Sequence, residues 1–129
     1  MVAVQAQFST TGQAIDSTLP VLDRAYLARF TFGNDALERE VLGLFADQAP
    51  RYLEALVDAR DAKGWKEAAH TLKGSAAAVG AKAVAQRAAL AEQLVPHGTA
   101  AMPSGPDRDQ AIAALRDAVA HALRAIAAL

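Results

Sequence analysis

Residues 65–81 read WKEAAHTLKGSAAAVGA, and this stretch decides the fold class. Its apolar side chains recur every three or four residues, which is the spacing of one face of an α-helix. The stripe consists of Trp65, Ala68, Ala69, Leu72, Ala76 and Val79. Because Gly80 then interrupts the pattern, the stretch predicts one amphipathic helix from about Trp65 to Val79 that packs this stripe inward.

The composition extends this helical interpretation to the whole chain. Of the 129 residues, 53% are hydrophobic but only 5% are aromatic. Alanine, which has the highest helix propensity of all residues, supplies much of the apolar content. A chain of this length forms one domain. We therefore expect a single all-α domain.

Upstream of the central helix, the pattern predicts a short helix followed by a long one. The short helix begins near Asp23 and ends at Gly33, a residue type suited to a helix C-terminus. Its expected inward side chains are Tyr26, Leu27 and Phe30. Residues 1–20 are polar and small without a sustained period, and we expect them to form a flexible N-terminal segment.

The long helix is capped by Asn34 and Asp35, and its apolar stripe keeps one phase across Pro50. Its stripe comprises Leu37, Val41, Leu44, Phe45, Tyr52, Leu53, Leu56 and Val57. Proline inside a helix removes a hydrogen bond and kinks the axis. A single helix bent at Pro50 therefore accounts for the pattern, and residues 61–64 predict a tight turn after it.

Downstream, two further helices complete the pattern. One runs from Ala81 to about Val95, and the last opens near Asp107 after a loop over residues 96–106. Their stripes are Val84, Ala88, Ala91, Leu94 and Val95, then Ile112, Leu115, Val119, Ala122, Leu123, Ile126 and Leu129. Because short connections favour antiparallel neighbours, we expect residues 21–129 to form an antiparallel four-helix bundle with a short extra N-terminal helix.

His70 lies on the side of the central helix away from the apolar stripe, about 160° from Leu72 at the helical period. An exposed histidine ring is largely neutral near pH 7, and a neutral ring nitrogen is nucleophilic. Lys73, one turn on, can pair with a phosphoryl group on that ring. Gly74 costs about 1 kcal/mol relative to alanine in a helix, and with Ala77 it leaves an open patch where another protein could approach.

These residues resemble the core of the histidine-containing phosphotransfer (HPt) domain family. The His-Thr-Leu-Lys-Gly-Ser motif is complete at residues 70–75, and Gly80-Ala81 follows as in the family. Residues 32–35 and Leu44-Phe45 with Pro50 are similar to upstream family patterns. The resemblance covers roughly residues 20–95, and the last helix matches only in pattern. Where the family often has Leu-Glu, this chain has Leu90-Ala91-Glu92, a departure that we expect to leave the site untouched.

The resemblance implies that His70 receives a phosphoryl group on Nε2 and that Lys73 balances its charge. The implied docking surface comprises Lys66, Gly74, Ser75 and Ala77. The partners would be receiver domains of hybrid histidine kinases and response regulators, which would bring the Mg²⁺. The chain itself would bind no cofactor and would be a monomeric cytoplasmic carrier rather than an autonomous enzyme. Ser75 would either help to orient the site or simply line the helix.

Charge and residue usage exclude several other classes. Thirteen Lys and Arg against fourteen Asp and Glu leave a net charge of −1, which argues against a nucleic-acid binder. Without cysteine there is no disulfide and no thiolate metal site. No stretch reaches the roughly 18–20 apolar residues of a membrane span, and residues 1–20 lack the features of a signal peptide.

Three alternatives stay open at this point. Glu67-Ala68-Ala69-His70 fits the Glu-x-x-His pattern of di-iron bundles. Such sites need a second Glu-x-x-His motif and two further inward-facing glutamates, and the motif must face the core. Neither His97 nor His121 has a glutamate three residues before it. The other two alternatives are a structural or dimerising bundle and a degenerate HPt-like adaptor that binds a receiver or kinase without phosphotransfer.

Overall fold

The computed structural model describes residues 21–96 and 98–129. They form five helices, which are α2 (Arg24–Thr31), α3 (Asp35–Val57), α4 (Ala62–Ala78), α5 (Lys82–Gln93) and α6 (Gly105–Ala127). This described part contains helices without strands, so the all-α class is confirmed. The flexible segment expected over residues 1–20 lies outside the described residues.

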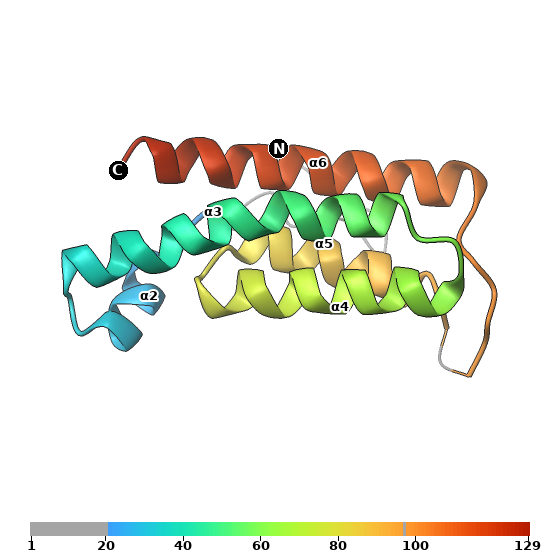
Figure 1. Ribbon diagram of the computed structural model, residues 1–129, viewed down its shortest axis with the longest axis horizontal. Helices are drawn as coiled ribbons and strands as arrows, with labels where there is room; N and C mark the ends of the chain where they lie inside the picture. The colour runs from blue at the N-terminus through green and yellow to red at the C-terminus, as the bar shows by residue number, and fades with distance from the viewer. Residues whose placement is uncertain (1–20, 97) are drawn as a thin grey trace, which may run out of the picture.

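The four longer helices lie side by side, and Figure 1 shows the chain reversing direction at each connection between them. Each of these helices packs against the next one in the sequence, and α6 returns to contact α3. The ring of contacts encloses one core. The short helix α2 packs against the N-terminal half of α3 at one end of the molecule (left in Figure 1).

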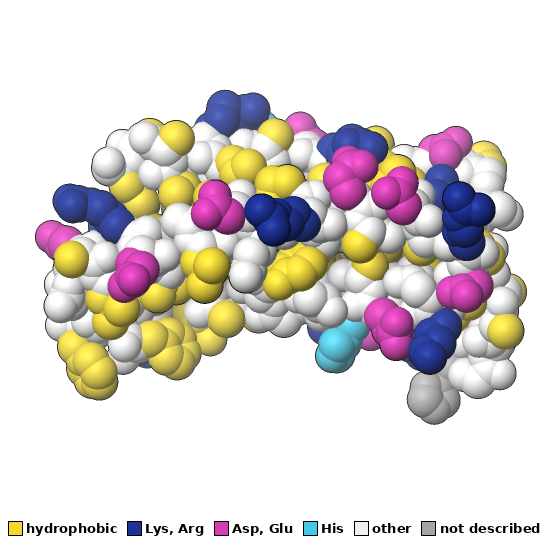
Figure 2. All heavy atoms as spheres, in the orientation of Figure 1, with side chains coloured by type: hydrophobic (Ala, Val, Ile, Leu, Met, Phe, Trp, Pro, Cys, Tyr) yellow, Lys and Arg dark blue, Asp and Glu magenta, His cyan; other side chains and the backbone are white. Residues whose placement is uncertain are grey.

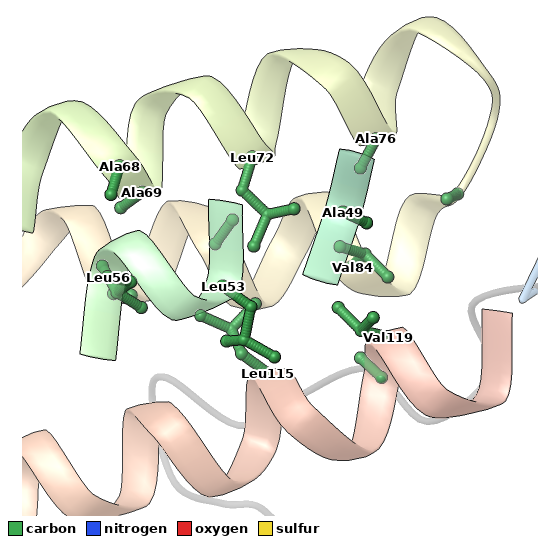
Figure 3. Close-up of a cluster of buried hydrophobic side chains, with 14 of the residues drawn as sticks. Ala49, Leu53, Leu56, Ala68, Ala69, Leu72, Ala76, Val84, Leu115 and Val119 are labelled. Carbon is green, nitrogen blue, oxygen red and sulfur yellow. The ribbon is translucent and has the colours of Figure 1, made fainter. Parts of the chain in front are cut away.

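The core is built from the stripes that the four helices turn toward one another. Figure 3 shows Leu53 and Leu56 of α3 facing Leu72 of α4 and Leu115 of α6. All six members of the predicted α4 stripe are buried, including Trp65 at 0% exposure. The indole Nε1 of Trp65 donates to the Ala91 carbonyl at 2.7 Å, which satisfies its buried polar atom and ties α4 to α5.

The predicted stripe of α3 is confirmed at Phe45, Leu53 and Leu56, which are buried, but the N-terminal half of the helix differs from it. Leu37 and Leu44, which were expected inside, are 39% and 57% exposed, whereas Glu38 and Leu42 are buried. Glu38 accepts a hydrogen bond from Arg24 Nε at 2.7 Å. Glu38, paired with Arg24 of α2, therefore occupies a buried position next to the one that the apolar pattern assigned to Leu37. The helix runs unbroken through Pro50, as predicted.

The predicted turn at residues 61–64 is wrong, because these residues form the first turn of α4. Asp61 is the N-cap, and its Oδ1 accepts from the Gly64 amide at 2.7 Å. A side-chain oxygen that satisfies a free amide in this way favours helix initiation. After the loop that precedes α6, the helix starts at Gly105 and not, as predicted, near Asp107. Pro106 therefore lies in the first helical turn, a position that proline favours.

In α2 and at the end of α6, some members of the predicted stripes are exposed. Phe30, expected inside, is 57% exposed and packs edge to face against Tyr26 on the same helix. Leu129, the last member of the predicted α6 stripe, is exposed as well. Figure 2 shows the resulting apolar side chains gathered over α2 and the start of α3. Only Leu27 anchors α2 by full burial of an apolar side chain.

The α4–α5 connection fixes how these two helices face each other. Gly80 has a φ of +78°, and a Cβ added there would lie 2.8 Å from the Asp23 carbonyl oxygen. The Gly80 carbonyl also accepts from the Asp23 amide at 2.8 Å. Glycine is therefore required by both the left-handed backbone and the close approach of α2.

Candidate functional site

His70 lies in the middle of α4 on its solvent face. Its side chain is 69% exposed, whereas Ala69 and Leu72 beside it are fully buried. The helix therefore presents the imidazole outward while the adjacent residues hold α4 in the core. This confirms the predicted orientation of His70 and gives a partner protein direct access to the ring.

Glu92, on the neighbouring helix α5, bridges the two principal side chains of the site. Its Oε2 lies 3.1 Å from His70 Nδ1, and its Oε1 accepts a hydrogen bond from Lys73 Nζ at 2.8 Å. The Glu92 side chain is only 18% exposed. One partly buried carboxylate thus holds both the ring and the ammonium group. We name His70, Lys73 and Glu92 the bridged triad.

The expectation that the Leu90-Ala91-Glu92 departure leaves the site untouched is therefore wrong. Glu92 stands eight residues after the buried Val84, which places it about 80° away at the helical period. It lies at the edge of the buried stripe of α5, next to α4. The position of Glu92 at the edge of the α5 stripe can be predicted from the sequence. Which residue of α4 Glu92 contacts depends on the register between α4 and α5, which the apolar pattern does not give.

The surroundings of Glu92 favour its charged form. The hydrogen bond from Lys73 lowers the pKa of Glu92 below its usual value of 4.5, against the opposing effect of burial, and the His70 ring adds a smaller lowering. Glu92 is therefore a carboxylate near neutral pH. A carboxylate accepts hydrogen bonds and donates none.

The contact to Glu92 distinguishes the two nitrogens of the His70 ring. Nδ1 faces the carboxylate, and the described residues give Nε2 no hydrogen-bond partner. A shallow groove runs beside the ring. Its lining residues are Lys63, Lys66, Glu67, His70, Thr71 and Glu92. Of these, only Lys66 and His70 belong to the predicted phosphoacceptor and docking residues.

The predicted docking residues lie on two sides of His70. Lys66 lines the groove toward the N-terminus of α4. Gly74 and Ala77 are exposed toward its C-terminus, and a Cβ added at Gly74 would meet nothing within 4 Å. Ser75 is half-buried and has no side-chain hydrogen bond to a described residue. The surface therefore carries the charged Lys66 on one side of the ring, and on the other the small, uncharged Gly74 and Ala77 beside Lys73.

The di-iron alternative does not fit this geometry. Glu67 and His70 are both exposed on the outer face of α4, whereas a di-iron pair must project into the bundle core. Within residues 21–96 and 98–129, no group of three or more His, Cys, Asp or Glu is placed to hold a metal ion. Over the same residues, each helix is too short or too polar to span a membrane.

Comparison with known families gives one match. The sequence model of the Hpt domain matches residues 40–125, which is more than half of the chain and includes the whole bridged triad. The chain belongs to the Hpt domain family. Searches of curated proteins and of solved structures found no match. The Hpt match extends into α6, beyond residues 20–95, to which the sequence resemblance was assigned.

Membership in the Hpt family establishes the general role of the fold. Hpt domains are phosphocarrier modules of phosphorelay signalling, they have no catalytic activity of their own, and they interact with receiver domains. In this chain the bundle presents an exposed histidine, His70, with Lys73 one helical turn away.

Proposed function

We propose that this Hpt domain is a histidine phosphotransfer protein that shuttles a phosphoryl group between receiver-domain aspartates through His70. The observation that carries the proposal is the exposed His70 ring, with Nδ1 engaged by Glu92 and Nε2 open to an incoming phosphoryl group. In the transfer, Nε2 attacks the phosphorus of an aspartyl phosphate, and the aspartate leaves as a carboxylate. A second receiver aspartate then takes the group from Nε2.

Lys73 supports this role as the countercharge. A phosphoryl group carries about 1.5 to 2 negative charges near pH 7. Lys73 lies one helical turn from His70, and its ammonium already sits beside the ring through the shared Glu92. Hydrogen bonds between ammonium and phosphoryl oxygens are among the stronger ones in proteins. We therefore assign Lys73 to stabilising the phosphorylated state.

The proposed partners are the receiver domains of hybrid histidine kinases and response regulators, and these supply Mg²⁺ and the phosphoaccepting aspartate. The chain then acts as a cytoplasmic monomer without a cofactor of its own. The uncharged strip at Gly74 and Ala77 is open to a closely approaching partner backbone. Lys66 lies on the opposite side of the ring, where it suits an acidic rim around a receiver active site. Ser75 belongs to the border of this docking surface.

Phosphotransfer from a panel of labelled receiver domains tests the proposal. The wild type should take up acid-labile label, and His70→Gln should take up none while keeping its helical circular dichroism. His121→Gln is the matched control, because His121 is another exposed helical histidine, on α6. Equal labelling of wild type and His70→Gln would contradict the site. Receiver binding without any transfer would instead indicate a degenerate adaptor.

A further inference from the structure

We propose that α2 detaches from the four-helix bundle and returns to it as a unit. The domain then has a closed state, with α2 packed on α3 at one end of the molecule (Figure 1), and an open state without that contact. Leu27 and Thr31 are the buried residues of α2, and α2 contacts α3 less extensively than the longer helices contact their neighbours. A segment that buries little apolar surface opens at a lower free energy than the core.

Asp23 fastens the start of α2 to the rest of the bundle through polar contacts. Its Oδ1 caps α2 by accepting from the Tyr26 amide at 3.0 Å, and its Oδ2 lies 3.0 Å from Lys82 Nζ at the start of α5. The Asp23 amide also donates to the Gly80 carbonyl at 2.8 Å. The carboxylate that starts the helix therefore also holds it against α5.

The second attachment is the ion pair between Arg24 of α2 and Glu38 of α3. Arg24 Nε donates to Glu38 Oε1 at 2.7 Å, and the Glu38 side chain is only 7% exposed. A buried carboxylate that loses its partner is strongly destabilised. Because detachment of α2 lets water reach Glu38, removal of Arg24 penalises the closed state specifically.

The connection between α2 and α3 stores backbone strain that the open state can release. Phe32 has a left-handed backbone with a φ of +53°, and Gly33 follows it at +74°. This conformation is unfavourable for a residue with a Cβ. The Phe32 side chain is 92% exposed, so packing against the described residues does not offset the strain. Detachment of α2 frees this backbone to relax.

Hydrogen exchange of the full chain, followed by mass spectrometry, tests the two states. In the wild type, the amides of α2 should exchange faster than those of α4 and α6. Asp23→Asn keeps a capping side chain but removes the charge that pairs with Lys82, so exchange of α2 should be about two- to five-fold faster. Arg24→Gln leaves the Glu38 carboxylate without its ion pair and should speed the exchange of α2 about ten-fold or more.

Two further variants make the test specific. Phe32→Asn should slow the exchange of α2, because asparagine adopts the left-handed backbone at less cost. Arg116→Gln is the matched control for Arg24→Gln, since Arg116 pairs with Glu54 between α6 and α3 at 3.5 Å, and it should leave α2 unchanged. Amides of α2 that exchange as slowly as those of α4 would overturn the proposal. Unchanged exchange of α2 in a folded Arg24→Gln protein would overturn it as well.

The consequence for signalling rests on the proposed function. Because Asp23 contacts Gly80, three residues beyond Ala77, α2 borders the proposed docking surface. A partner that binds the closed state shifts the equilibrium toward that state. A bound receiver domain should therefore slow the exchange of α2, and equal exchange in the free and bound proteins would contradict this coupling. If no receiver domain binds the wild type, the proposed function fails, whereas exchange of the free protein still decides whether α2 opens.

Discussion

Gly74 is the residue at which helix stability and partner access compete most directly. It lies inside α4 on the exposed face, with open space where a side chain would be. Glycine in a helix interior costs about 1 kcal/mol relative to alanine, and nothing in the packing of the free protein requires it. On the proposed function, access for a partner supplies a physical reason for a glycine here.

Two substitutions separate these effects. Gly74→Ala should raise the free energy of unfolding by about 1 kcal/mol in a urea titration, because it improves helix propensity without a clash. Gly74→Leu should also fold, yet its transfer from a receiver should be slow, because the added bulk stands where the partner docks. Gly43→Leu on α3 is the control, as a Cβ there also meets nothing within 4 Å. Wild-type transfer by Gly74→Leu would remove Gly74 from the docking surface.

At the same scale, the sequence predicts some members of the site and not others. His70 and Lys73 lie three residues apart on one helix, so the helical period alone places them on one face. Glu92 joins them from 22 residues further along. Its contact depends on the α4–α5 register, which the Gly80 turn and the Trp65–Ala91 hydrogen bond set. No local pattern contains that register.

Among the elements, the turn at Gly80 is the connection on which α2, α4 and α5 depend together. Gly80→Ala should lower the free energy of unfolding by more than the roughly 1–2 kcal/mol that a left-handed backbone costs a non-glycine residue, because its Cβ would meet the Asp23 carbonyl at 2.8 Å. Gly33→Ala is the matched control. Gly33 also has a positive φ, of +74°, but open space around it.

Urea unfolding of the two variants provides the measurement. Gly33→Ala should show the backbone cost alone, and Gly80→Ala a clearly larger loss. Equal losses in the two variants would show that the contact between Asp23 and the α4–α5 turn adds nothing to the stability of the fold.

The elements also show where apolar periodicity succeeds and where it fails. All six predicted stripe positions from Trp65 to Val79 are buried, because every buried position there is apolar, and the prediction misses Ala62 in the first turn of α4. On α3 the buried Glu38 breaks that rule by pairing with Arg24 of α2. A pattern that assigns only apolar residues to the core then selects Leu37, one position away. The sequence predicts a turn at Asp61, where the structure has a helix cap, because capping and turn formation use the same side chains.

At the scale of the whole molecule, the free energy of unfolding at acid pH depends on two carboxyl groups, those of Asp23 and Glu92. The backbone amide of Tyr26, helped by Lys82, lowers the pKa of Asp23 below its usual 3.8, and Lys73 lowers the pKa of Glu92 below 4.5. A carboxyl group with a lowered pKa in the folded state contributes stability above its unfolded pKa and loses it as the pH falls. We therefore expect the protein to lose stability progressively below about pH 4.5.

Glu92→Gln should reduce this loss, because it removes one of the groups that must be protonated. The difference in free energy of unfolding between wild type and Glu92→Gln should be larger at pH 7 than at pH 3. Urea titrations at the two pH values measure it. A difference that stays constant between them would show that Glu92 titrates no differently in the folded and unfolded protein.

The fold class is the feature of the whole molecule that composition and periodicity determine most fully. An alanine-rich chain with several amphipathic stripes and short connections can bury those stripes only by packing helices together. The placement of α2 is less determined, because a single fully buried apolar side chain, Leu27, and polar contacts by Arg24 and Asp23 hold it. Polar contacts between elements leave no period in the sequence.

The position of the phosphorus tests the central claim most directly. The protein is phosphorylated by a receiver domain, and its imidazole nitrogens are then observed by NMR with phosphorus coupling. We predict one phosphorylated nitrogen, Nε2 of His70, with the proton retained on Nδ1 and the His121 ring unchanged. Phosphorus on Nδ1 of His70, or on His121, would contradict the account, because the contact with Glu92 would then not determine which nitrogen reacts.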